Sequence, residues 1–233
     1  ALDLHPPLIS WHTQRDNLVE CAGWLSLLTG SLAKIAQDII LLAQSEVDEV
    51  RETADAQRGG SSTMPQKSNP IISEAVIAIA RANANLLATL HQAQIQEHER
   101  GTHGWQVEWI TLPTLFIYTA AALQKIHFLS QNLVVNQSTM QQNVAASNGL
   151  MMAEPLALAL SQPLGPEAAR ALVKEACQVV LAEKRHLVDV VREKTEIPLD
   201  WARVGREANY LGVAQAVIDR VLASAALRQS SEA

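Results

Sequence analysis

The chain has 233 residues, of which 48% are hydrophobic and 18% are charged, and its formal net charge at pH 7 is −6. This composition suits one or two globular domains with a sizeable core. The basic residues form no block of the kind found in nucleic-acid-binding proteins, so no nucleic-acid partner is expected. No uninterrupted apolar run reaches the ~18 to 20 residues that span a bilayer, and no signal segment opens the chain, so no membrane partner is expected.

The two cysteines, Cys21 and Cys177, lie in apolar helical patterns and form no CxxC pair. This favours buried thiols in a reducing compartment and predicts a cytoplasmic protein. The chain begins with Ala1 and continues with an extended, Pro-containing segment over residues 2–10. We therefore expect it to be a fragment of a longer protein.

Apolar residues recur every three or four positions from Asp16 onward, which predicts one continuous helix of about thirty residues. The predicted apolar face consists of Leu18, Cys21, Leu25, Leu28, Leu32, Ile35, Ile39 and Leu42. Charged residues gather over positions 46–52, where the helix is expected to fray into a loop. A helix of this length is typical of a bundle.

The next segment, residues 59–70, is a predicted loop with the chemistry of anion binding. It reads GGSSTMPQKSNP, so two adjacent hydroxyls, a lysine and an amide lie close together. The two glycines permit unusual backbone angles, and Pro65 fixes one. A flexible Gly/Ser linker is the alternative interpretation, but Pro65 and Lys67 argue against it.

Two further long helices follow this loop. Pro70 opens the first, in which apolar residues keep the helical spacing and Asn83 falls on the apolar face, either as a register device or as part of a polar pocket. The second is predicted from about Trp105 to Asn143. Pro113 lies inside it, which predicts either a kink or a true helix start near Leu112.

After residues 147–149 the helices become short and are interrupted by proline and glycine, which indicates a second, smaller domain. Strand signals are nearly absent. The predicted fold class is all-α: a long helical bundle over residues 1–145, containing the loop 59–70, followed by a small helical domain over residues 146–233.

The run from Gly60 to Pro70 matches every fixed position of the pattern GSSxMPxKxNP, and the sequence thereby resembles the fumarase/aspartase superfamily. In that superfamily the first serine removes a proton next to a carboxylate, which implies that Ser61 is the general base. The resemblance assigns substrate binding to Ser62, Lys67 and Asn69. It also implies that an N-terminal domain, the early part of the bundle and the general acid lie outside this chain.

Four further segments resemble the bacterial 3-carboxy-cis,cis-muconate cycloisomerases. They are Trp11–Asp16, Glu97–Arg100, Glu108-Trp109 and Gly149–Glu154. This resemblance implies lactonisation of a small polycarboxylate in the protocatechuate branch of the β-ketoadipate pathway, without metal or other cofactor. It also implies a homotetramer with shared active sites. The candidate substrate-binding residues in the first segment are His12, Thr13, Gln14 and Arg15.

Several alternatives remain open at this point. Arg15 could pair with a substrate carboxylate, with Asp16, or with an acid on a neighbouring helix, and His12 could be a structural histidine. Adenylosuccinate lyases share the layout but carry an arginine where this chain has Trp109, which weakens the prediction of a nucleotide substrate. A lyase that releases fumarate from adenylosuccinate or argininosuccinate is the alternative enzyme. A non-catalytic structural bundle is the third possibility. His98 and His103 are five residues apart, the wrong spacing for a helical zinc motif.

Overall fold

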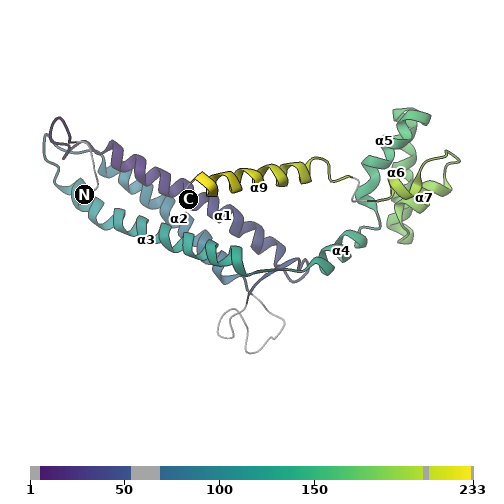
Figure 1. Ribbon diagram of the computed structural model, residues 1–233, viewed down its shortest axis with the longest axis horizontal. Helices are drawn as coiled ribbons and strands as arrows, with labels where there is room; N and C mark the ends of the chain where they lie inside the picture. The colour runs from purple at the N-terminus through teal and green to yellow at the C-terminus, as the bar shows by residue number, and fades with distance from the viewer. Residues whose placement is uncertain (1–5, 54–68, 207–209, 232–233) are drawn as a thin grey trace. The chain divides into compact units, whose positions relative to one another are not determined.

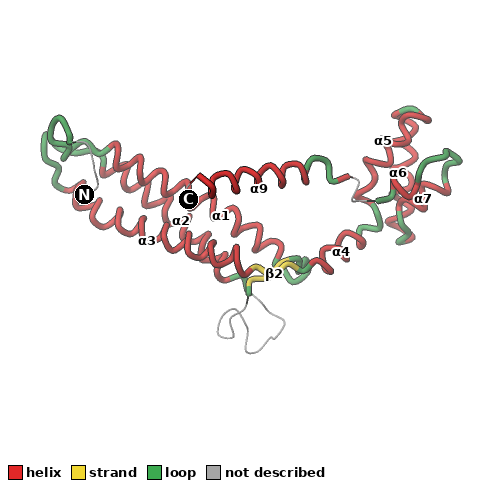
Figure 2. Tube along the Cα trace, viewed as in Figure 1, coloured by secondary structure: helices red, strands yellow, loops and turns green. Residues whose placement is uncertain are grey.

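The computed structural model describes residues 6–53, 69–206 and 210–231, and these are predominantly helical (Figures 1 and 2). The all-α fold class is therefore confirmed. The chain divides into two compact units, residues 1–140 and 141–233, each with its own hydrophobic core. The sequence had placed this division a few residues later, at 145/146.

The first unit is built on three long helices that pack side by side: α1 (Asp16–Leu42), α2 (Ile71–Ala93) and α3 (His103–Asn132) (Figure 1). Helix α2 runs back along α1, because the beginning of α1 packs against the end of α2 and the beginning of α3. That end of the bundle is held by Val19, Ala22, Leu25, Leu90 and Leu115. The opposite end is held by Ile39, Val50 and Leu129.

The buried face of α1 differs from the predicted apolar face. It consists of Val19, Ala22, Leu25, Thr29, Ala36 and Ile39. Only Leu25 and Ile39 belong to both sets, and Ile35 is 47% exposed. The reason is that small side chains allow neighbouring helices to approach closely, so the contact line follows alanine and threonine as well as the largest apolar residues. Cys21 is exposed, so the prediction that both thiols are buried is wrong for this residue.

A polar contact lies in the middle of the bundle. The Asn83 side chain donates to the hydroxyl oxygens of Thr119, at 3.0 Å, and of Thr29, at 3.4 Å, and all three residues are buried. Both hydroxyls also bond to carbonyls of their own helices. One residue from each long helix thus meets at the same level, the arrangement expected of a register device.

Two short strands correct the prediction for residues 46–52. Helix α1 ends at Leu42, and β1 (Val50–Glu52) pairs antiparallel with β2 (Leu133–Val135). The segment is therefore not a frayed helix. It becomes a strand because Val50 inserts into the core at this end of the bundle, while the neighbouring backbone pairs with a strand more than eighty residues later.

Helix α3 also differs from its prediction. It begins at His103, continues through Pro113 and ends at Asn132, so a helix start near Leu112 is wrong. Pro113 lies on the exposed side of the helix. The carbonyl that loses its partner there can be solvated, and the helix therefore tolerates the proline. Helix α4 (Gln137–Ala146) follows β2 as a separate element.

By length and composition alone, α1 and α2 in the described part of the chain are long and apolar enough to cross a membrane. A third candidate arises if the bent pair Gln137–Ala146 and Leu150–Leu164 is counted as one span. Isolated polar residues interrupt both helices, so their sequences contain no uninterrupted apolar run of that length.

The second unit has its own core, formed mainly by α5 (Ala153–Leu164), α6 (Pro166–Glu183) and α7 (Leu187–Glu193). Its remaining described elements are η1 (Leu150–Met152), α8 (Trp201–Val204) and α9 (Ala214–Ser231). Cys177 lies on α6 and is partly buried, and this burial raises the pKa of its thiol.

Gly149 lies close to His186 in this unit. Its φ is +75°, and a Cβ added there would lie 2.7 Å from the imidazole ring of His186. Glycine is required both for the left-handed backbone and for this close approach. The contact fixes the turn before η1 against the beginning of α7.

Candidate functional site

Three of the predicted site residues, Ser61, Ser62 and Lys67, lie outside the described residues. The fourth site residue predicted from the signature, Asn69, directly precedes Pro70 and α2 and is partly buried. Its carbonyl accepts a hydrogen bond from the Ile71 backbone N–H at 2.9 Å.

The beginning of α2 is held by a carboxylate from another element. Glu52, the last residue of β1, accepts hydrogen bonds from the backbone N–H groups of Ile72, at 3.0 Å, and Ser73, at 2.8 Å. It also accepts a bond from the Ser73 hydroxyl at 2.7 Å. Glu52 is only 8% exposed. These bonds satisfy donors that the first turn of a helix always leaves without an internal partner.

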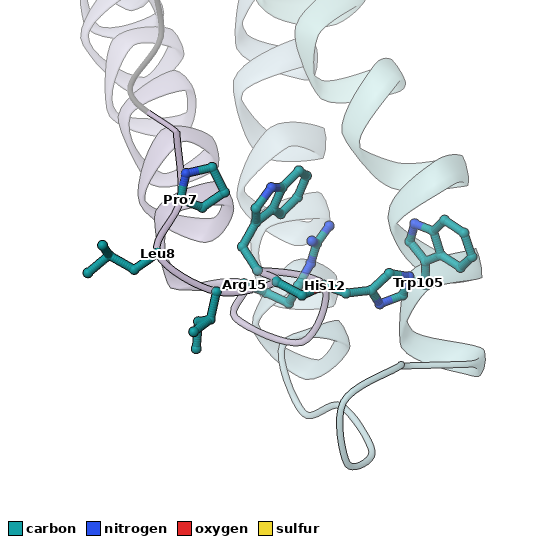
Figure 3. A pocket seen from close by; sticks show the side chains of 8 residues that line it. Pro7, Leu8, His12, Arg15 and Trp105 are labelled. Atoms are coloured by element: carbon teal, nitrogen blue, oxygen red, sulfur yellow. The ribbon is translucent and has the colours of Figure 1, made fainter.

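The remaining predicted residues lie before α1. His12, Thr13 and Gln14 form a turn in which the Gln14 N–H donates to the Trp11 carbonyl at 3.2 Å. Thr13 is partly buried and Gln14 is exposed. This turn borders a cavity of about 610 Å³ between the N-terminal segment and the beginning of α3 (Figure 3). The lining residues are Pro7, Leu8, Ile9, Ser10, Trp11, His12, Arg15 and Trp105.

His12 is the chemically unusual group in this cavity. Its imidazole packs edge-on against Trp105, with 4.7 Å between ring centroids (Figure 3). Both ring nitrogens are buried, and neither has a hydrogen-bond partner among the described residues. A buried polar atom without a partner costs free energy. Both hydrogen-bonding positions of the His12 ring are therefore unused among the described residues.

Arg15 has a partner within the chain. Its guanidinium donates through Nε to Glu108 Oε1 at 2.8 Å and through a terminal nitrogen to Glu108 Oε2. The two side chains are 7% and 5% exposed. The guanidinium also lies over the Trp11 ring, 5.4 Å from its centroid. Arg15 thus pairs with an acid on a neighbouring helix, and its contact with a substrate carboxylate stays a prediction.

The two groups of candidate residues lie at opposite ends of the bundle. His12 and Arg15 precede the first turn of α1, whereas Asn69 precedes α2 beside the other end of α1 (Figure 1). The 27 residues of α1 separate these ends, a length of about 40 Å at the helical rise per residue. A single copy of the described chain does not bring them into one site.

Sequence reasoning missed three residues that organise these ends. Glu52 lies in a run of charged residues, and Trp105 stands at the start of a predicted helix, so neither position indicates a role in a site. Glu108 belongs to a segment that carries the family resemblance, but the spacing of a helix does not reveal which residue of another helix faces it. The sequence does indicate that Glu108 is buried, since it lies among apolar residues at helical spacing.

Within residues 6–53, 69–206 and 210–231 there is no group of three or more His, Cys, Asp or Glu side chains that could hold a metal ion. His103 contacts Glu97 instead. Glu97 also accepts from the Thr102 backbone N–H, and this hydrogen bond is the main reason that the pKa of Glu97 is lowered.

Residues 4–82 match a protein-family model described as lyase. The 3-carboxy-cis,cis-muconate cycloisomerase of Pseudomonas aeruginosa is 42% identical over 95% of this chain and 50% of its own length. Trans-aconitate decarboxylase 1 of Mycosarcoma maydis is also 42% identical, over 95% of this chain and 46% of its own length. The crystal structure of 3-carboxy-cis,cis-muconate lactonizing enzyme from Pseudomonas putida is similar with a TM-score of 0.86 and 38% identity, covering 95% of this chain and 51% of that chain.

These matches confirm the predicted resemblance to the fumarase/aspartase superfamily of lyases. Within the superfamily, they also confirm the resemblance to the 3-carboxy-cis,cis-muconate cycloisomerases. The chain spans about half the length of the curated relatives it matches.

Proposed function

We propose that the protein is a cycloisomerase that interconverts 3-carboxy-cis,cis-muconate and 4-carboxymuconolactone. The observation that carries this proposal is the similarity to cycloisomerases over 95% of the chain, in sequence and in structure. The complete signature from Gly60 to Pro70 supports it.

In the proposed reaction, read from the lactone, Ser61 removes a proton next to a carboxylate and an internal carboxylate leaves. A serine hydroxyl is a weak base, so its alkoxide must be stabilised, and each pKa unit corresponds to about 1.4 kcal/mol. Lys67 and the backbone N–H groups around Ser61 and Ser62 are the proposed source of this stabilisation, and Lys67 and Asn69 bind the substrate carboxylates. No metal or other cofactor takes part.

We further propose that the protein acts as a homotetramer whose sites combine residues from different copies. The separation of about 40 Å between Asn69 and the cavity with His12 supports this, because the predicted site residues at the two ends are too far apart to contact one substrate molecule. Exposed apolar side chains on the bundle provide contact surface for other copies. They include Trp24, Leu27, Trp109, Ile110, Phe116 and Ile117, which are between 46% and 76% exposed.

Within such a site, His12, Thr13 and Gln14 are proposed to contact substrate, and Arg15 to hold this segment through Glu108. The proposed location is the cytoplasm, with no nucleic-acid or membrane partner. In this proposal, α1 and α2 are long and apolar because they pack against other helices and not against lipid.

A second candidate is decarboxylation of an unsaturated tricarboxylate, because the trans-aconitate decarboxylase is as similar in sequence as the cycloisomerase. Both substrates carry three carboxylates and at least one carbon–carbon double bond, so one set of anion-binding groups would suit either. A lyase that releases fumarate is a further enzymatic alternative, and a structural bundle is the non-catalytic one.

The deciding experiment assays the full-length protein on 3-carboxy-cis,cis-muconate, trans-aconitate and argininosuccinate in parallel. Lactone formation is expected, whereas release of CO2 or of fumarate would select an alternative enzyme. No turnover of any substrate would favour the structural bundle. Ser61→Ala is the matched control: it is expected to lose most turnover while its unfolding transition remains, and near-normal turnover would remove Ser61 from the role of base.

A further inference from the structure

The N-terminus of α2 is capped by a side chain that belongs to a different secondary-structure element. Pro70, at the N-cap position, makes no side-chain hydrogen bond to the first turn. The cap is Glu52, which reaches Ile72 and Ser73 from a position 20 and 21 residues earlier. A serine or aspartate at position 70 would satisfy the same N–H groups locally. The hydrogen bonds from Ile72 and Ser73 to Glu52 also connect α2 to β1.

Strand β1 is itself fixed in the bundle. Its residues pair with β2, Glu52 opposite Leu133, and Val50 is 3% exposed in the core. The Asn136 N–H donates to the Glu49 carbonyl at 2.9 Å, which extends the pairing. Glu52 is therefore a buried carboxylate on a paired strand, and its hydrogen bonds join β1 to the first turn of α2.

Asn69 lies three residues before Ile72 and is connected to it through Pro70 and Ile71. Proline restricts its own φ and the conformation of the residue before it, which here is Asn69. A displacement of the first turn is therefore transmitted to Asn69. Misplacement by about 1 Å in an active site can reduce the rate about 100-fold.

We propose that Glu52 is a positioning residue that acts through Asn69: it fixes the first turn of α2 and thereby the orientation of Asn69 toward a substrate carboxylate. This inference rests on the proposed function for its catalytic consequence. Its structural part, the hold on the first turn, can be measured independently.

The test uses the full-length protein with Glu52→Ala, Glu52→Gln and the control Arg51→Ala. Arg51 is the neighbouring residue in β1, is exposed and pairs with Asp48. Hydrogen exchange across residues 69–73 should be faster in Glu52→Ala than in Arg51→Ala. With 3-carboxy-cis,cis-muconate, kcat/KM should fall about 10- to 100-fold in Glu52→Ala. Glu52→Gln, which retains one oxygen acceptor, should lie between Glu52→Ala and wild type.

A double-mutant cycle with Asn69→Ala separates positioning from a general loss of stability. If Glu52 acts through Asn69, adding Glu52→Ala to Asn69→Ala should lower kcat/KM little further, whereas independent effects would multiply. Multiplicative losses, or unchanged exchange across residues 69–73, would overturn the inference. Absence of turnover in wild type on this substrate would instead refute the proposed cycloisomerase, and the exchange comparison would still decide whether Glu52 holds the turn.

Discussion

The buried pair of Arg15 and Glu108 offers a demanding test of the structure. Arg15→Met removes the guanidinium and leaves a carboxylate that is only 5% exposed. Removing one member of such a pair typically costs about 3–5 kcal/mol, because the remaining charge is buried without its partner. Loss of the contact with the Trp11 ring adds about 0.5–1 kcal/mol.

The double variant Arg15→Met/Glu108→Leu should be far less damaging than the sum of its parts. Replacing both members of a buried pair by apolar side chains is often neutral or even stabilising. The free energy of unfolding should therefore fall in each single variant and largely recover in the double variant. Urea unfolding followed by tryptophan fluorescence measures this, since Trp11 and Trp105 lie beside the pair.

The same variants distinguish the two roles considered for Arg15. If Arg15 only holds residues 11–15 against α3, the double variant should retain a KM close to that of wild type. If Arg15 also binds a substrate carboxylate, KM should rise although stability recovers. Single variants as stable as wild type, or a double variant as unstable as the two losses added together, would show that the buried pair is wrongly described.

Three further outcomes are expected. Gly149→Ala should lower stability by about 2–4 kcal/mol, through left-handed backbone strain and the collision with His186, and thermal unfolding measures it. Asn83→Leu should change the urea midpoint little, equivalent to less than about 1 kcal/mol, because both threonine hydroxyls keep backbone acceptors; a large loss would mean that the amide contact matters more. The hydrogen bond from Arg51 lowers the pKa of Asp48. The contribution of the ionised Asp48 to the free energy of unfolding is therefore complete above the ordinary aspartate pKa and is lost as the pH falls through the folded-state pKa. In Asp48→Asn, the free energy of unfolding should therefore decrease less between neutral and acidic pH than in wild type.

The long helices could be predicted because apolar residues repeat with the helical period over many turns. The exact buried faces could not, since Ala22 and Ala36 contribute to the contact through their small size, which a search for large apolar residues overlooks. The strands were missed because three residues are too few to show alternation. Only the partner strand, far away in the sequence, makes Val50–Glu52 extended.

In the candidate site, too, local features could be predicted from the sequence and contacts between distant residues could not. The signature could be assigned from the sequence because its residues are contiguous, and Asn69 and Pro70 are the part of it within the described residues. The pairing of Arg15 with Glu108 joins residues 93 positions apart. No local pattern specifies such a contact, because it depends on how α1 and α3 are rotated against each other.

The separation of Asn69 from the cavity with His12 has a genetic consequence. Suppose that each active site combines Asn69 from one copy with the His12 cavity from another. A copy with substitutions at both ends of its bundle then inactivates every site to which it contributes. In random assemblies containing equal amounts of normal and defective chains, about one quarter of the sites would then be intact instead of one half. A defective allele would therefore be partly dominant over a normal one.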